Sequence, residues 1–329
     1  MTEILALIEH DRGETAETSF QSIGLARAMV DAGLGSTVTA VVIGADGDAV
    51  VSDLGRFGVE RAISVHHEAL TDYAPEAWGE ALAAIVADRA PAAVVATGTD
   101  RGNEVLAHLA AITDLPFAAN VTEVRAGEGD AVALTRVRWG GSLLERSRLN
   151  ASMLVLSGAA HVFSAPADAA ANDVAVEVFE PQLPETASRT RIVDRVTLAS
   201  GITLTTAAVV VSGGRGVGSA EGFAPLEELA ELLGGAVGCS RVVTNNGWRP
   251  HSDQVGQTGK RIAPELYIAC GISGAIQHWV GMMAAKHVLA INTDGEANMV
   301  GKAEYAVLGD LHQIVPAISE EIRKRRANK

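Results

Sequence analysis

Short apolar runs alternate with longer amphipathic segments along most of this chain, and this rhythm constrains the fold more than any other feature. In the first half, apolar runs begin at Ile4, Thr37, Arg61 and Ala92. Segments with helical periodicity separate them, over residues 20–33, 49–58 and 75–89. Strands that alternate with helices build a largely parallel sheet. The sequence therefore predicts an α/β protein, with residues 131–139 and 152–158 as further strands, expected to be antiparallel.

The rhythm is interrupted at residues 180–191, where EPQLPETASRTR contains two prolines and no apolar periodicity. Such a stretch is typical of a linker, and 329 residues exceed what one core usually holds. We therefore expect two domains, an N-terminal α/β domain over residues 1–185 and a C-terminal domain over residues 192–329. Because the rhythm restarts after the interruption, the second domain is expected to be an open, doubly wound parallel sheet.

The composition disfavours several classes of protein. A net charge of −14 argues against binding to nucleic acids or anionic membranes, and the basic run IRKRRANK is expected to be a solvated last helical turn. Cys239 and Cys270 lie far apart without a metal-ligand spacing, which fits a reducing compartment. The first residues lack the pattern of a signal peptide, and no apolar run reaches the roughly 18 residues of a membrane span. A cytoplasmic protein is therefore expected.

Small and hydrogen-bonding residues follow three apolar runs of the second half. The segment SGGRG follows AAVVV, SGAIQH follows LYIACGI, and Asn292 and Asp294 follow HVLAI. Ligands of open α/β sheets bind beyond the carboxyl ends of the strands, so the sequence predicts a ligand site there. Ser273 is expected to be the N-cap of the helix that follows, with His278 one turn into it.

Two glycine-rich segments resemble nucleotide loops without matching them. In SGGRGVGS, Ser219 stands where a dinucleotide loop has its third glycine or alanine. The segment still suits a phosphate, with Arg215 as a charged donor, and a plain tight turn is the alternative. In QVGQTGKR, Gln254 and Arg261 replace the glycine and hydroxyl residue of a P-loop, which argues against a nucleotide triphosphatase. That segment offers hydrogen-bonding groups at Gln257 and Thr258, or is a surface turn.

Taken together, the second-half motifs closely resemble the α subunit of electron transfer flavoproteins. The similarity rests on VVSGGRG, QVGQTGK, PELYIACGISGAIQHWVGM and VLAIN, in this order and spacing, and covers about the last 120 residues. The first half resembles the family's N-terminal domain only in general pattern, including LALIEH and the GTDRGNE loop. The resemblance implies that the second domain binds FAD and that the first contacts a partner subunit.

The resemblance also implies a set of FAD contacts. Arg241 would lie over the flavin ring, Thr258 would reach its N5 edge and His278 would approach its pyrimidine oxygen. Arg241 and His278 would then supply a cation or donor where the reduced ring carries negative charge. No catalytic residue or metal ligand is expected. The FAD contacts implied by the resemblance are Arg215, Ser240, Arg241, Val255, Gly256, Gln257, Thr258, Ser273, Gly274, Ala275, Ile276, Gln277, His278, Asn292, Asp310 and Leu311.

The function implied by the resemblance is electron transfer without substrate chemistry of its own. Electrons would come from flavin dehydrogenases, such as the acyl-CoA dehydrogenases of fatty acid β-oxidation, and pass to a quinone oxidoreductase. The chain would form a heterodimer with the family's β subunit, which is expected to bind AMP. Two alternatives stay open: an electron-bifurcating member of the family, and a nucleotide-binding structural or regulatory protein without redox function.

Overall fold

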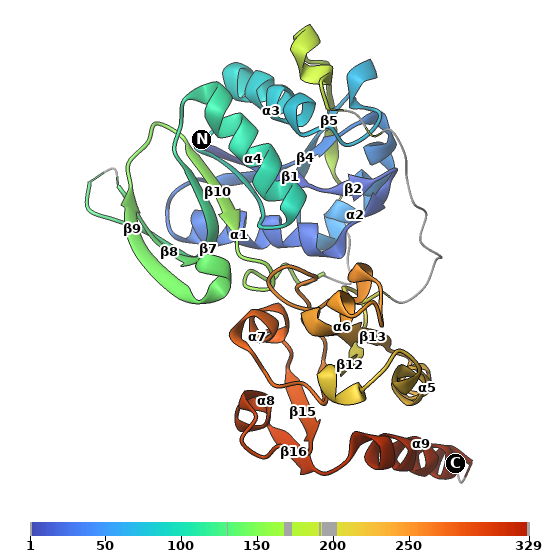
Figure 1. The fold of residues 1–329 in the computed structure, drawn as a ribbon. Coiled ribbons are helices and arrows are strands. Elements are labelled where there is room, and N and C mark those ends of the chain that lie inside the picture. The colour runs from blue at the N-terminus through green and yellow to red at the C-terminus, as the bar shows by residue number, and fades with distance from the viewer. Residues whose placement is uncertain (1, 130, 168–172, 191, 193–202, 328–329) are drawn as a thin grey trace. The chain divides into compact units, whose positions relative to one another are not determined.

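The computed structural model consists of two compact units, each built on its own sheet (Figure 1). It describes residues 2–129, 131–167, 173–190, 192 and 203–327. The first unit comprises residues 1–139 and 143–196, and the continuous part of the second is 197–329. The point of division therefore lies in a stretch outside the described residues. The predicted α/β class with two sheets is confirmed.

The first unit contains a nine-stranded mixed sheet in the order β11-β5-β4-β1-β6-β10-β7-β8-β9. Neighbouring strands are parallel except for the β7–β8 and β8–β9 pairs, and a small β2–β3 hairpin lies outside the sheet. The strands are β1 (Glu3–Ile8), β2 (His10–Asp11), β3 (Glu14–Thr15), β4 (Thr37–Ile43), β5 (Arg61–Val65), β6 (Ala93–Thr97), β7 (Phe117–Ala126), β8 (Val132–Arg138), β9 (Leu143–Leu149), β10 (Leu154–Gly158) and β11 (Ala175–Phe179).

The two later strands predicted for the first half differ in direction. β8 is antiparallel to both neighbours, as expected. The expectation for residues 152–158 is wrong, because β10 pairs in parallel with β6 and β7. All five residues of β10 are buried, and strands buried on both faces are typical of the parallel interior of an α/β sheet.

Helices cover both faces of the first sheet. These helices are α1 (Gln21–Asp31), α2 (Asp48–Leu54), α3 (Pro75–Arg89) and α4 (Asp100–Thr113). Alternate residues of β1 point to opposite faces, so Ile4 and Ile8 join the core under α1 and α2, while Leu5 and Leu7 join the core under α3 and α4. The segment GTDRGNE does not form the expected loop, because most of it belongs to the first turn of α4. The Thr99 hydroxyl caps that helix.

The described part of the predicted linker packs on the first unit. Residues Glu185–Ser188 form a 3-10 turn, and Ala187 is 2% exposed in the same core cluster as Trp78. The Thr190 hydroxyl donates to a carboxylate oxygen of Glu76 in α3 at 2.7 Å. A polar, proline-containing stretch therefore docks through its few small and hydroxyl side chains.

The second unit is an all-parallel five-stranded sheet in the order β13-β12-β14-β15-β16, which confirms the predicted doubly wound fold. Its strands are β12 (Val209–Gly213), β13 (Ala236–Cys239), β14 (Leu266–Cys270), β15 (His287–Asn292) and β16 (Tyr305–Leu308). The chain leaves β12, the second strand in this order, towards β13 on one side and then crosses to β14 on the other. The point where strand order reverses therefore lies between β12 and β14, where such sheets bind ligands.

Two layers of helices enclose this sheet. Helices α5 (Ala224–Leu232) and α9 (Leu311–Ala327) pack on the face formed by Val211, Ile268 and Ile291. Helices α7 (Ile276–Met282) and α8 (Asn298–Lys302) cover the opposite face, and the short α6 (Arg241–Asn245) follows β13. The basic run forms the exposed end of α9, where Lys324 pairs with Glu320. Among the described helices, none combines the length and apolarity needed to cross a bilayer.

Candidate functional site

The carboxyl ends of β12, β13, β14 and β15 border a cleft of about 620 Å³ in the second unit. This volume lies in the range of small-molecule and cofactor sites. Its lining comes from segments that are distant in sequence: Arg215 and Gly216 after β12, residues 240–245 after β13, residues 271–278 after β14, and residues 292–297 after β15. Residues 254–258 complete it. The cleft therefore lies where the doubly wound topology predicts a ligand.

Backbone segments meet closely at the floor of this cleft. The Gly214 and Gly216 N–H groups donate to the carbonyls of Cys270 and Gly271, at 2.9 and 3.1 Å. A Cβ atom on Gly214 would lie 2.3 Å from the Gly271 carbonyl oxygen, and one on Gly216 would lie 2.8 Å from the Gly271 Cα atom. Only glycine fits such contacts, so the SGGRG segment holds the two loops of the switch point together.

The QVGQTGK segment forms one wall of the cleft. Its Val255 N–H donates to the Cys239 carbonyl at 2.9 Å, which continues the sheet beyond β13. Its Gln257 N–H donates to the Gln277 carbonyl at 2.7 Å, which attaches the segment to the first turn of α7. Gln257 and Thr258 are exposed residues of a turn, so the segment is a surface turn that also lines the cleft, and its backbone is bonded to two elements.

The cleft gathers groups that favour an anion. Arg215 and Arg241 are exposed and form no ion pair with any described residue. Within the described part of the chain, the backbone N–H groups of Ser273, Gly274 and Ala275 meet no hydrogen-bond acceptor. Cations and clustered N–H donors together suit a phosphate or pyrophosphate, in a protein whose net charge is strongly negative.

His278 lies at the inner end of the cleft and is 7% exposed. Its Nε2 atom is 2.8 Å from the buried hydroxyl of Tyr267. Burial lowers the pKa of His278 to about 4, although the Val255 carbonyl acts in the opposite direction. The imidazole is therefore neutral at pH 7. Of the two roles expected for His278, a cation or a hydrogen-bond donor, only that of a neutral donor agrees with this pKa.

Two buried polar atoms of the cleft have no partner among the described residues: Ser240 Oγ and His278 Nδ1. A buried polar group without a hydrogen bond costs free energy, about 1 to 3 kcal/mol. Such groups in a cleft indicate positions where a ligand completes the bonding. Ser240 is the N-cap residue of α6, but its hydroxyl makes no capping bond, which leaves it available to a ligand.

All but three of the residues predicted to contact FAD line this cleft. The exceptions are Ile276, Asp310 and Leu311. Ile276 is 48% exposed, and Leu311 is 5% exposed within the core beneath Gly271. Asp310 accepts a hydrogen bond from the His312 N–H at 2.9 Å and so caps α9. Direct contact with FAD stays a prediction for these three residues and for those that line the cleft.

The expected helix cap at Ser273 is wrong. Helix α7 begins at Ile276 and Ala275 occupies the N-cap position. Gly274 has a φ of 79°, a left-handed conformation that interrupts the chain before the helix, and the Ser273 carbonyl accepts from the Met299 N–H instead. The Asn292 side chain supports the same loop, since its amide donates to the Ile272 carbonyl at 3.1 Å.

Gln254 lines the cleft although it is not among the FAD contacts implied by the resemblance, and so does Asp294, which the sequence placed beside Asn292 at a strand end. Gln254 is 2% exposed and its side chain bonds to Thr244 and Thr258. It lies in the quoted QVGQTGK motif, but there it counted only as a departure from a P-loop. Asp294 follows Asn292 at the end of β15, and its carboxylate accepts from the Glu296 N–H at 2.9 Å.

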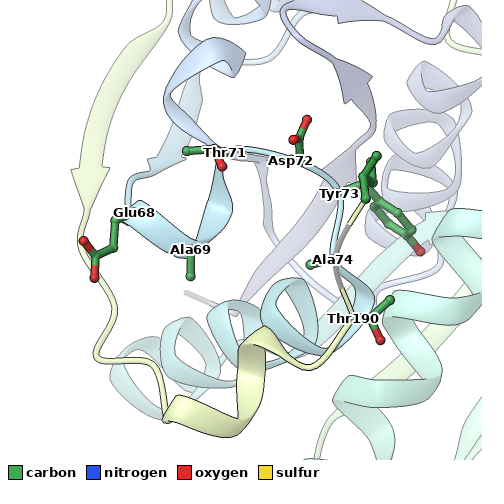
Figure 2. Close-up of a pocket in the computed structure, with 8 residues that line it drawn as sticks. Glu68, Ala69, Thr71, Asp72, Tyr73, Ala74 and Thr190 are labelled. Atoms are coloured by element: carbon green, nitrogen blue, oxygen red, sulfur yellow. The ribbon is translucent and has the colours of Figure 1, made fainter. Parts of the chain in front are cut away.

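A second hollow, of about 350 Å³, lies in the first unit at the loop that follows β5. Figure 2 shows its lining of acids and hydroxyls, with the carboxylates of Glu68 and Asp72 pointing in different directions and Thr190 beside Tyr73. An acidic lining repels phosphate groups, and the two carboxylates do not converge on one point. This hollow is a poorer candidate for a nucleotide than the cleft of the second unit.

In the first unit, a side chain of the unit itself occupies the corresponding edge of the sheet, at the carboxyl ends of the strands. Glu9, directly after β1, is 4% exposed and accepts from the Thr99 hydroxyl at 2.6 Å at the N-terminus of α4. Burial raises the pKa of Glu9 to about 7, while the Thr99 hydrogen bond and the charge of Arg101 oppose the rise. A carboxyl group thus fills the place beside a helix N-terminus where an anion would bind.

Comparison with known proteins identifies the family. The model of the electron transfer flavoprotein domain matches residues 4–184, and that of the electron transfer flavoprotein FAD-binding domain matches residues 203–283. The electron transfer flavoprotein subunit alpha of Mycobacterium leprae is 37% identical, over 99% of this chain and 100% of its own length. The chain belongs to the electron transfer flavoprotein alpha-subunit family. The resemblance of the motifs is therefore confirmed, and so is FAD as the cofactor.

Other relatives agree. The electron transfer flavoprotein subunit alpha of Bacillus subtilis is 32% identical over 98% of each chain, and Protein FixB of Clostridium saccharobutylicum is 30% identical over 96% of this chain and 95% of its own length. A solved structure described as a putative thiamin diphosphate-dependent enzyme from Mycobacterium smegmatis covers 96% of this chain and 59% of that one. Its TM-score of 0.24 and identity of 11% are too low to support an inference.

The cleft fits the family's cofactor. Arg215 and the N–H groups of residues 273–275 suit a pyrophosphate. Arg241 offers a contact to a polar ring edge, as do Ser240 Oγ and His278 Nδ1, which have no partner among the described residues. The glycine contacts at the floor let backbone approach a phosphate closely. As an electron transfer flavoprotein alpha subunit, the chain is an FAD-binding electron carrier.

Proposed function

We propose that this chain is the FAD-carrying subunit of a heterodimer that accepts electrons from flavin dehydrogenases and delivers them to a quinone oxidoreductase. The acyl-CoA dehydrogenases of fatty acid β-oxidation are the proposed donors. The partner is the family's β subunit, with AMP as its nucleotide, and the complex works in the cytoplasm. Family membership over nearly the whole chain supports this proposal.

The observation that carries the proposal is the chemical character of the cleft. It combines two arginines that form no ion pair with a described residue, a neutral histidine and backbone donors. No hydroxyl that lines it is hydrogen-bonded to His278 in the described part of the chain, so it presents no nucleophile paired with a base. Such a site suits binding and tuning of a redox group more than conversion of a substrate.

Each group of the cleft has a proposed task. Bound FAD supplies an electron-accepting ring whose reduced form carries negative charge near its N1 and C2 oxygen edge. Arg241 places a cation near that edge, and His278 presents a neutral donor to it. Arg215 and the N–H groups of the Gly274 loop hold the pyrophosphate. The buried Tyr267 and His278 pair excludes water from the inner end.

The test is a visible absorption spectrum of the chain co-purified with its β subunit, followed by identification of the nucleotides released by acid. The proposal predicts a yellow, one-to-one complex that releases FAD and AMP and is reduced by an acyl-CoA dehydrogenase with its substrate. A complex that stays colourless after saturation with FAD would refute it. Release of two FAD molecules instead of FAD and AMP would favour the electron-bifurcating alternative.

A further inference from the structure

The buried side chain of Gln254 is hydrogen-bonded to two elements that line the FAD cleft. It is 2% exposed. Its Nε2 atom donates to Thr258 Oγ1 at 2.9 Å, and its Oε1 atom accepts from Thr244 Oγ1 at 2.8 Å. Thr244 belongs to α6, the helix that begins with Arg241, whereas Thr258 belongs to the wall that packs on α7. One buried amide therefore ties together two walls of the site.

The backbone of Gln254 is fixed as firmly as its side chain. Its N–H donates to the His251 carbonyl at 3.0 Å, and its carbonyl accepts from the Lys260 N–H at 2.6 Å. A Cβ atom on Gly259 would lie 2.2 Å from the Gln254 carbonyl oxygen, so the turn closes tightly around this residue. Hydrogen bonds thus hold both the backbone and the side-chain amide of Gln254, so the amide cannot move when a ligand binds.

The direction of the Gln254 amide decides what Thr258 offers to the cleft. A threonine hydroxyl has one proton and two lone pairs. Because the Gln254 N–H occupies one lone pair of Thr258 Oγ1, the Thr258 proton stays free to be donated. With the amide reversed, Thr258 would donate its proton to Gln254 Oε1 and would present only lone pairs to the cleft.

From this geometry we infer that Gln254 is a positioning residue for FAD, because its amide orients the Thr258 hydroxyl as a hydrogen-bond donor into the cleft. The inference rests on the proposed function and on the prediction from the family resemblance that Thr258 reaches the N5 edge of the flavin ring. Thr244 completes the arrangement, since its single proton is shared between the Gln254 amide oxygen at 2.8 Å and the Arg241 carbonyl oxygen at 2.9 Å. Gln254 acts on the cofactor through Thr258 and does not transfer electrons itself.

A double-mutant cycle on the heterodimer tests this coupling. The variants are Gln254→Glu, Thr258→Val and their combination, with Thr258→Ser as the control that keeps the hydroxyl. Glutamate has nearly the shape of glutamine, but its carboxylate only accepts hydrogen bonds, so the Thr258 proton must turn towards it. Any effect of the added charge on the flavin is common to the two proteins that carry Gln254→Glu and cancels within that pair.

The readouts are the FAD dissociation constant, from flavin fluorescence, and the flavin midpoint potential. In the wild-type background, Thr258→Val should weaken FAD binding about fivefold to tenfold and shift the potential, as the loss of one hydrogen bond implies. In the Gln254→Glu background the same change should weaken binding less than about twofold and leave the potential in place. The serine control should match the wild type in both readouts.

Equal effects of Thr258→Val in the two backgrounds would overturn the inference, since Gln254 would then not act through Thr258. If the Gln254→Glu protein does not fold, Gln254→Met removes the amide without adding charge and should reduce the effect of Thr258→Val to below about threefold. An unreduced effect there would also overturn it. A complex that binds FAD but whose dissociation constant and potential do not change with Thr258→Val would contradict only this inference. A complex that binds no FAD would contradict the proposed function.

Discussion

Arg241 and His278 reach the cleft in different charge states, and this difference predicts unequal effects on the flavin. Removal of the Arg241 charge should lower the flavin potential, because the reduced ring is the negatively charged form. A charge-assisted contact of about 1.5 to 3 kcal/mol corresponds to roughly 60 to 130 mV for one electron. His278 is neutral, so His278→Gln should have a clearly smaller effect.

Redox titration of the heterodimer with Arg241→Ala, Arg241→Lys and His278→Gln checks this order. The lysine variant keeps the charge and should retain most of the wild-type potential, apart from the loss of the planar guanidinium. A larger shift for His278→Gln than for Arg241→Ala would show that the histidine is charged in the complex. No shift in any variant would show that neither side chain faces the ring.

Ionisation of His278 ties the stability of the second unit to pH. The folded pKa of about 4 lies below the ordinary value of 6.5, so between these values the unfolded chain binds more protons. Stability should therefore fall as the pH drops from about 6.5 to 4, by about 2 to 3 kcal/mol in total. Urea denaturation of the FAD-free protein, followed in the second unit, should show this loss in the wild type and much less of it in His278→Gln. Parallel curves for the two proteins would contradict the assignment.

Glu9 predicts the opposite pH dependence in the first unit. Its folded pKa of about 7 lies above the ordinary value of 4.5, so its contribution is complete below pH 4.5 and is lost as the pH rises towards 7. At pH 8, Glu9→Gln should stabilise the first unit by about 2 to 3 kcal/mol, since a neutral amide still accepts from Thr99. Hydrogen exchange of β1 and α4 peptides at pH 5 and pH 8 measures this, and an equal difference at both values would refute it.

At the scale of elements, the close contact of the loops after β12 and β14 is the most demanding feature of the site. Gly214→Ala should destabilise the second unit by about 1 to 3 kcal/mol and weaken FAD retention, because its Cβ atom would meet the backbone at Gly271. Gly301→Ala in α8 is the matched control, since no atom lies within 4 Å of its Cβ position.

Thermal denaturation and FAD release compare these two alanine variants directly. The control should be neutral or slightly more stable, because alanine is favoured over glycine within a helix by about 0.5 to 1 kcal/mol. Equal behaviour of the two variants would mean that the two loops do not meet as closely as the structure shows.

Elements with clear start and end signals could be predicted from sequence, and those shaped by neighbours could not. α3 matches its predicted range, 75–89, because Pro75 opens it and its apolar positions are buried. β9 and β11 could not be predicted because they are largely exposed, and β13 could not be predicted because it is only four residues long. The direction of β10 depends on its partners β6 and β7, which sequence periodicity does not encode.

The features of the site can likewise be divided into those that the sequence predicts and those that it does not. The lining segments were recognisable because motif order and strand ends place them together, and most of their residues do line the cleft. Sequence reasoning could not find the partners of individual side chains: Tyr267, which bonds His278, reads as a core residue, and Gln254 reads as a failed P-loop glycine. Burial then sets the charge state of His278, and burial follows only from the packed fold.

At the scale of the whole molecule, the two units differ at the carboxyl ends of their parallel strands. In the first unit Glu9 fills the place beside α4, whereas in the second the corresponding edge opens into the FAD cleft. The asymmetry predicts that FAD affects one unit only. It also leaves the first unit available for the proposed contact with the β subunit.

Hydrogen exchange of the FAD-stripped heterodimer, with and without added FAD, tests the central claim most directly. Bound FAD should slow exchange in peptides that contain residues 212–218, 239–258 and 271–278, because these segments line or support the cleft. Peptides of β1 and α4 in the first unit should exchange at unchanged rates. Protection confined to the first unit, or FAD binding without protection of the segment 271–278, would contradict the assignment of the cleft as the FAD site.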